Sequence, residues 1–149
     1  MGNLEMQGGQ TLNLDAGNYF LTKLTTRNSL GNIPPPQIYA TGKITLYVDG
    51  DIDVKRLYIY GQNTDPTKVT IKVIGDHDVK IENESHIHGV VYAPNSEVKL
   101  KQSTVWGAVI GDEIKVDGSA TIHYDEALST SGDYISGTTV DVLSWREPN

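Results

Sequence analysis

The sequence contains no cysteine, so it has neither a disulfide framework nor a thiolate that could bind a metal or act as a nucleophile. Phenylalanine occurs once, and 12 lysines and arginines stand against 19 aspartates and glutamates. The formal charge is −7, and the basic residues form no block. We therefore expect neither nucleic acid nor an anionic membrane surface as a partner.

Long apolar runs are also missing. No stretch approaches the ~20 apolar residues of a membrane helix, so we expect no direct membrane insertion by this chain. No secretion leader is visible, and neither the G-x-S-x-G motif nor a phosphate-binding P-loop occurs. We interpret residues 1–10 as linker or appended residues, followed by one domain over residues 11–149.

The residues that are abundant favour strands and turns. Glycine occurs 15 times, and Val, Ile and Thr are frequent. Glycine supplies the backbone conformations of tight corners, while β-branched side chains fit pleated surfaces. A hydrophobic content of 38% suits a thin, elongated core. The composition predicts an all-β protein.

A short repeat runs between His86 and Leu128. Ile87, Val105 and Ile122 occupy the same place in three successive units, 18 and 17 residues apart. An alternating apolar pair recurs along the chain as Ile52/Val54, Val79/Ile81, Val98/Leu100 and Ile114/Val116. Units of this length hold three brief strands and their corners but no helix, and each must stack on its neighbours to bury its apolar face.

Stacked units of similar length predict a single-stranded parallel β-helix of about five or six coils. Hexapeptide repeats of the left-handed kind are absent, which favours a right-handed helix. Two polar insertions interrupt the coils: Leu30–Ile38, with three consecutive prolines, and Tyr60–Lys68. We expect the segment after Leu128 to cap the open end of the stack, with packing by Val140, Val142 and Trp145.

Acidic residues form the candidate metal site. Asp49, Asp51 and Asp53 share the outward parity, and Asp76 and Asp78 lie in the equivalent turn of the next coil. Stacked carboxylates repel one another unless a cation bridges them, and several oxygen ligands suit Ca²⁺. The alternative is that they form ordinary Asp-Gly and Gly-Asp turns.

Histidines and tyrosines offer further candidates. His86 and His88 share one strand face, where they could bind zinc, but no third ligand is fixed by spacing, so structural histidines are the preferred interpretation. An exposed row of tyrosines could stack on sugar rings or bind protein, whereas core and corner packing is the default interpretation of each tyrosine taken singly. The candidate ligand-binding residues are Tyr39, Tyr47, Tyr58 and Tyr60.

The run GVVYAPNSEVKLKQSTVWGAVIGDEIKVDGSATIHYDEAL resembles the closing coils of β-helical C-terminal domains in bacterial cell-envelope and pilus-associated (PilX- or MshQ-like) secreted proteins. The upstream runs LNLDAGNYF and ITLYVDGDIDV are similar to that domain as well. The resemblance implies a surface-exposed structural or adhesive module, and it supplies no catalytic residues. The coils are also distantly similar to bactofilins, although the polar insertions and irregular coil lengths would disturb end-to-end stacking.

We therefore expect a non-enzymatic structural or adhesive module, extracellular or at the cell surface, without a cofactor unless calcium binds. Its loops would bind other envelope or pilus proteins, or a surface glycan; the oligomeric state is open. One alternative is a carbohydrate-binding or polysaccharide-degrading β-helix protein, in which paired acids act as general acid and base. Another is a self-polymerising scaffold. The regular coils from His86 to Leu128 are interpreted as scaffold, with the functional surface between Leu30 and Asp78.

Overall fold

The computed structural model describes residues 2–27 and 32–124, and in these ranges the chain is all-β with every strand pairing in parallel. The strands are β1 (Gly2–Met6), β2 (Thr11–Leu14), β3 (Gly17–Thr26), β4 (Gln37–Ala40), β5 (Ile44–Val48), β6 (Ile52–Lys55), β7 (Tyr58–Gly61), β8 (Val69–Val73), β9 (Asp78–Glu82), β10 (His86–Lys101), β11 (Thr104–Asp117) and β12 (Thr121–Tyr124). The predicted all-β class and parallel pairing are confirmed. Among the described residues, no helix has the length and hydropathy needed to cross a bilayer.

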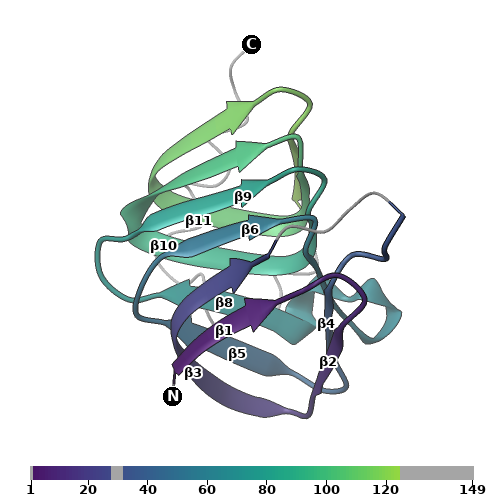
Figure 1. Cartoon of the computed structure of the whole chain (residues 1–149). Helices are drawn as coiled ribbons and strands as arrows, with labels where there is room; N and C mark the ends of the chain where they lie inside the picture. Colours follow the sequence, from purple (N-terminus) through teal and green to yellow (C-terminus); the bar gives the residue numbers. More distant parts are fainter. Residues whose placement is uncertain (1, 28–31, 125–149) are drawn as a thin grey trace.

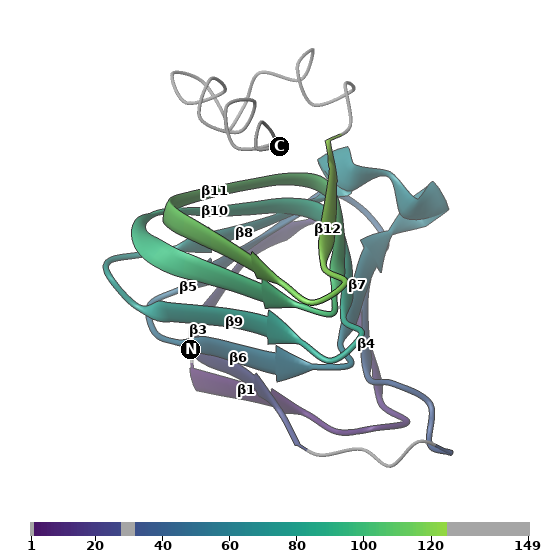
Figure 2. The ribbon, with the colours of Figure 1, turned by 90° about the horizontal axis from the view of Figure 1, so that it is seen from above.

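The strands form three faces, which the chain visits in a fixed order (Figures 1 and 2). Face A comprises β2, β4, β7, β12 and the first parts of β10 and β11. Face B comprises β5, β8, the first half of β3 and the middle of β10 and β11. Face C comprises β1, β6, β9, the second half of β3 and the ends of β10 and β11.

Long strands connect these faces into one sheet. β10 has 16 residues and β11 has 14, and both bend through two corners while they remain paired with each other. Because β9 also pairs with β10, the 12-stranded sheet closes on itself. It therefore resembles a parallel barrel with additional strands. Two turns, β4–β5–β6 and β7–β8–β9, consist of three separate short strands as predicted, whereas β10 and β11 each run through a whole turn without a break.

The core lies inside the closed sheet, and the predicted repeat positions fill it. Ile87 pairs in register with Val105, and Val105 with Ile122, as the spacing predicts. The recurring apolar pair also aligns, since Val79 lies in register with Ile52 on one side and Val98 on the other. Equivalent apolar side chains thus stack directly above one another at the inter-strand distance of about 4.8 Å.

Buried serines stabilise the corners. The Ser85 hydroxyl, at the corner between faces C and A, accepts a hydrogen bond from the Leu57 N–H at 3.0 Å and donates to the Glu82 carbonyl at 2.9 Å. Ser96 has the same role between faces B and C, where its hydroxyl accepts from the His77 N–H. A buried corner must satisfy its backbone polar groups, and these side chains do so where strand pairing stops.

The fold begins earlier than the sequence indicates. Residues 1–10 were expected to precede the domain, but β1 pairs in parallel with β3, and Met6 is only 3% exposed. The short alternation of Leu4 and Met6 was the available signal. At the other end, the expected capping residues Val140, Val142 and Trp145 lie outside the described residues.

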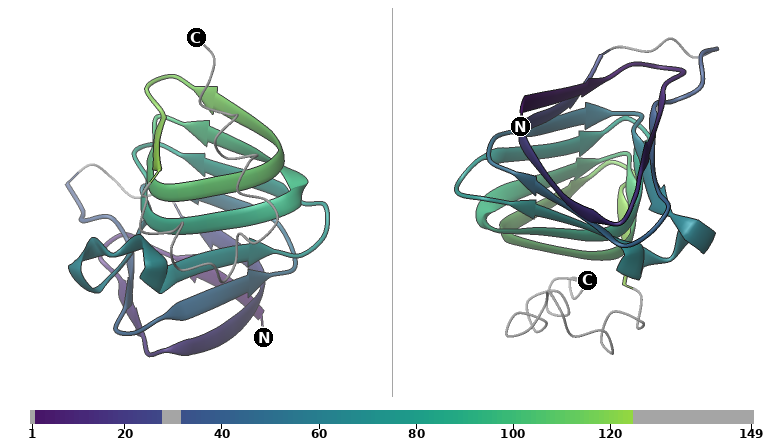
Figure 3. Two further views of the ribbon diagram at one scale, coloured as in Figure 1. Left: turned by 180° about the vertical axis from the view of Figure 1, so that it is seen from behind. Right: turned by 90° about the horizontal axis from the view of Figure 1, so that it is seen from below.

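The second polar insertion is an ordered projection between β7 and β8 (Figure 3). It consists of two short 3₁₀ turns, η1 (Gln62–Thr64) and η2 (Pro66–Lys68). The Asp65 carboxylate caps the second turn by accepting the Thr67 N–H at 2.9 Å and the Thr67 hydroxyl at 2.8 Å. The backbone hydrogen bond from Thr67 lowers the pKa of Asp65, because it favours the ionised carboxylate.

Candidate functional site

The outer surface of face A carries a ladder of aromatic rings. Its strands alternate, so residues on either side of the buried Ile59, Ile87 and Val105 point outward. Parallel register then places like positions of successive turns side by side. The main column of the ladder contains Tyr39, Tyr60, His88, Trp106 and His123.

Most neighbouring rings in this column touch. Tyr39 and Tyr60 lie 5.2 Å apart between ring centroids, in a tilted arrangement. Trp106 stacks between two imidazoles, with centroids 4.5 Å from His88 and 5.7 Å from His123. Aromatic pairs at such separations contribute about 0.5–1.5 kcal/mol each beyond the area that they bury.

A second, shorter column runs beside the first. Tyr58 meets His86 edge to face, with ring centroids 4.7 Å apart, and His86 also stacks on Trp106 at 5.5 Å. Both imidazoles of the His-x-His motif therefore point outward, as the inward assignment of Ile87 predicts. Their rings contact aromatic neighbours from adjacent turns.

The ladder is interrupted between Tyr60 and His88. β7 and β10 pair only through Tyr58 with His86 and Ile59 with Ile87, and no pairing follows. Among the described residues, no ring contact joins Tyr60 to His88. A cleft of about 340 Å³ opens here, and its lining residues are Tyr58, Tyr60, Thr64, His86, His88 and Trp106.

The second insertion explains why the cleft exists. After Gly61 the chain leaves β7 and forms η1 and η2, instead of turning directly into face B. Asn63 and Thr64 adopt positive φ angles of 60° and 50°, which fold the insertion into a tight turn. Thr64 from this turn lines the cleft beside the rings of face A. The insertion thus forms one side of the cleft, beside the outer surface of face A.

The lining of the cleft is mainly aromatic and apolar, with a few polar groups. Among the described residues, its lining contains no Asp, Glu, Lys or Arg. Burial lowers the pKa of His88 below its usual value of 6.5, and the nearby His86 lowers it further, so His88 is neutral at pH 7. The Tyr60 hydroxyl donates to the Gln37 side-chain oxygen at 2.8 Å, which holds that ring in place.

Three of the four predicted ligand-binding tyrosines gather at this cleft. Tyr58 and Tyr60 line it, and Tyr39 supports Tyr60 from the neighbouring strand. Tyr47 lies apart on face B, where it stacks on Phe20 with ring centroids 4.9 Å apart. The Lys72 ammonium lies 5.8 Å from the centre of the Tyr47 ring.

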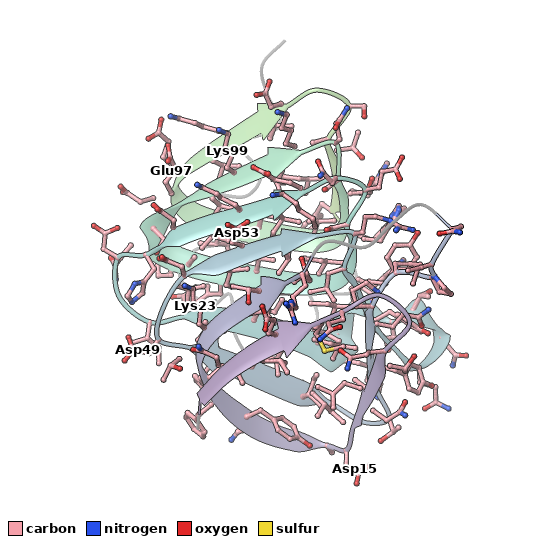
Figure 4. The ribbon with its side chains drawn as sticks, viewed as in Figure 1. Asp15, Lys23, Asp49, Asp53, Glu97 and Lys99 are labelled. Carbon is pink, nitrogen blue, oxygen red and sulfur yellow. The ribbon has the colours of Figure 1, made fainter. Side chains whose placement is uncertain are left out.

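The predicted calcium ligands have other partners. His77 Nε2 lies 3.3 Å from Asp49 Oδ1, and the Asp51 carboxylate accepts the Asp78 N–H at 3.0 Å. Asp53 is in register with Lys80 on face C, and Figure 4 shows Asp49 and Asp53 well separated. Within residues 2–27 and 32–124, no group of three or more His, Asp or Glu side chains is placed to hold a metal ion. The structure therefore offers no support for the calcium site.

Sequence reasoning missed half of the cleft. His86, His88 and Trp106 belong to the regular coils, which were interpreted as scaffold, whereas Tyr58, Tyr60 and Thr64 lie in the expected functional region. One signal was present: Trp106 follows His88 by 18 residues, the same spacing as Val105 from Ile87. That spacing places the two rings side by side.

A family model described as a domain of unknown function, DUF7305, matches residues 29–131. The chain belongs to this family. The DUF7305 match includes all of the described residues that line the cleft, while β1, β2 and β3 lie outside it. No curated protein and no solved structure matches the chain.

Proposed function

We propose that this DUF7305 domain is a non-enzymatic structural or adhesive module of the bacterial cell envelope, and that it binds its partner in the cleft of face A. The observation that carries the proposal is the cleft at the interrupted aromatic ladder. Ring-lined clefts with a few neutral polar groups are the usual form of a small-ligand site. An extracellular or cell-surface location belongs to the same proposal.

The finer description of the fold is part of this proposal. We regard the closed sheet as a single-stranded, right-handed parallel β-helix. The support is that equivalent residues pair in parallel from turn to turn on all three faces. A body of this kind is held together by backbone hydrogen bonds along its whole length, which suits a rigid support that presents one surface.

The lining residues favour binding over catalysis. Glycoside hydrolysis usually requires two carboxyl groups on either side of the scissile bond. The described lining of the cleft has none, and its two imidazoles pack against aromatic rings. We therefore keep polysaccharide degradation as the alternative that the experiment must exclude.

A pair of matched tyrosine variants tests the proposal. Tyr60→Ala removes a ring that lines the cleft, whereas Tyr47→Ala removes an equally half-buried, stacked ring on face B. We expect the whole chain to co-sediment with bacterial cell-envelope fragments, and Tyr60→Ala to weaken this binding at least tenfold while Tyr47→Ala leaves it unchanged. Equal binding by both variants would refute the role of the cleft, and release of sugars from the fragments would refute a non-enzymatic function.

The self-polymerising scaffold is tested separately. A polymer of stacked chains would gain mass as its concentration rises, because end-to-end contacts are driven by mass action. Light scattering over a thousandfold range of concentration distinguishes the two models. We expect a constant mass, because an adhesive module needs no contacts between its own copies.

A further inference from the structure

The interrupted ladder leaves ring surfaces without a neighbour. Trp106 has a ring on both of its sides, because it lies between His88 and His123. In the part of the chain that the structure describes, Tyr60 has a ring neighbour, Tyr39, on one side only, and His88 has Trp106 on one side only. Their remaining sides border the cleft. The cleft therefore lies between the rings of two consecutive turns, at the point where their ring-to-ring contact is absent.

We infer that a neutral pyranose ring of a surface glycan occupies this place. A sugar ring carries C–H groups on its faces and hydroxyl groups around its edge. The first feature matches aromatic surfaces, and the second matches hydrogen-bonding groups at their margins. This inference rests on the proposed function, for which it names the class of ligand.

The lining combines mostly apolar ring surface with a few polar groups, which suits a ligand that has both kinds of surface. All six lining residues carry a hydroxyl, an imidazole or an indole N–H group. The Tyr60 hydroxyl donates its hydrogen to Gln37, and the Thr64 hydroxyl donates to the Asn63 carbonyl at 2.6 Å. Their oxygen lone pairs are left to accept hydrogen bonds from sugar hydroxyls. A purely apolar ligand would leave these lone pairs unused, whereas sugar hydroxyls can donate to them while the C–H faces of the sugar contact the rings.

The absence of formal charge from the described lining selects against an ionic ligand. Within residues 2–27 and 32–124, no Lys or Arg borders the cleft to pair with a carboxylate, a sulfate or a phosphate, and no Asp or Glu borders it to pair with an amine. The lowered pKa of His88 keeps its imidazole uncharged at neutral pH. Uronic acids and phosphorylated sugars thus find no counter-charge here.

The size and shape of the cleft agree with one or two sugar residues of a longer chain. Its volume of about 340 Å³ is at the lower end of the roughly 300–1,000 Å³ of small-molecule pockets. Thr64 borders it on the side of the insertion, and the rings of face A border the other side. The remaining residues of a glycan would extend along the surface.

The experiment uses the whole chain and defined oligosaccharides. Neutral gluco-, manno-, galacto- and N-acetylglucosamine oligosaccharides are titrated at up to 10 mM, beside oligogalacturonate and a tyrosine-containing peptide. We expect at least one neutral oligosaccharide to shift the NMR signals of the Trp106 indole N–H and the His88 ring. Binding only by oligogalacturonate, binding only by the peptide, or no binding at all would refute the inference.

Two variants show where the sugar binds. Tyr60→Ala should weaken the affinity at least tenfold, with Tyr47→Ala as the matched control. Thr64→Trp should also weaken it at least tenfold, because a large side chain at this exposed position would fill the cleft without disturbing the core. Retention of affinity in folded samples of both cleft variants would refute the assignment, and circular dichroism establishes that each variant is folded.

Competition separates this inference from the proposed function. If neutral oligosaccharides fail to displace the chain from envelope fragments, but binding to the fragments still requires Tyr60, the module is adhesive and the ligand class is wrong. If binding to the fragments does not require Tyr60, the proposed function itself fails. If neutral oligosaccharides displace the wild-type chain, both statements are supported.

Discussion

The imidazole of His88 lies flat against the indole of Trp106, with ring centroids 4.5 Å apart and planes inclined by 5°. The two residues occupy equivalent positions in β10 and β11, which pair in register. Such a stack forms wherever two aromatic residues occupy the same outward position in consecutive turns. This contact holds the His88 ring, which borders one side of the cleft, against the indole of Trp106.

We expect this stack to be energetically coupled. Aromatic pairs contribute about 0.5–1.5 kcal/mol beyond buried area, so a double-mutant cycle of His88→Ala and Trp106→Ala should give a coupling free energy in that range. Urea denaturation of the wild type, both single variants and the double variant measures it. Strict additivity of the two single effects would show that the contact contributes nothing to stability.

His88 should make the protein less stable in acid. Burial lowers the pKa of His88 in the folded state, and the charge of His86 adds to this effect. The unfolded chain therefore binds a proton first, and the stabilisation present above pH ~6.5 is lost as the pH falls through the folded-state pKa. We expect the free energy of unfolding to fall less between pH 7 and 5 in His88→Gln than in the wild type. NMR titration of the His88 ring checks the direction independently, since a value at or above 6.5 would contradict the explanation.

Gly107 should tolerate no side chain. Its φ is +149°, and a Cβ atom would overlap the carbonyl oxygen of Gly89 in the preceding turn. Gly17 has nearly the same φ, +151°, but nothing lies within 4 Å of the equivalent atom. Gly17→Ala should therefore cost about 1–3 kcal/mol for the backbone conformation alone, and Gly107→Ala more than ~4 kcal/mol. Thermal unfolding measures both, and equal losses would show that the close approach of the two turns is unimportant.

Ser85 should be required at its corner. Ser85→Ala would leave the Leu57 N–H and the Glu82 carbonyl without their buried partner, at a cost of about 1–3 kcal/mol. Ser119 is exposed, so Ser119→Ala serves as the control and should change the free energy of unfolding by less than ~0.5 kcal/mol. If urea denaturation gives the same small change for both, the corner hydrogen bonds are replaced by water.

Calcium should not stabilise the protein. The candidate carboxylates of the sequence analysis are separated or partnered by His77 and backbone N–H groups, and no suitable cluster occurs among the described residues. The melting temperature should be the same in 5 mM CaCl₂ and 5 mM EDTA. A rise of several degrees with calcium would reveal a site that these residues do not account for.

The register of the fold could be predicted from the sequence because a repeat of constant length brings like positions together. The spacing alone aligned Ile87, Val105 and Ile122, and alternation gave the outward direction of His86 and His88. Both inferences need only local periodicity. Strand continuity could not be predicted, because whether β10 bends or breaks at a corner depends on the pairing of its neighbours.

The cleft could be identified only from the tertiary structure. Tyr60 and His88 are 28 residues apart, and parity shows that both point outward but not that their strands stop pairing between them. The path of the second insertion creates that interruption, since it draws the chain away from face A after Gly61. The sequence by itself thus determined the all-β class, the stacking of equivalent residues and the outward direction of His86 and His88. Only the tertiary structure decided which rings meet and where the ladder opens, because that depends on the pairing of distant strands.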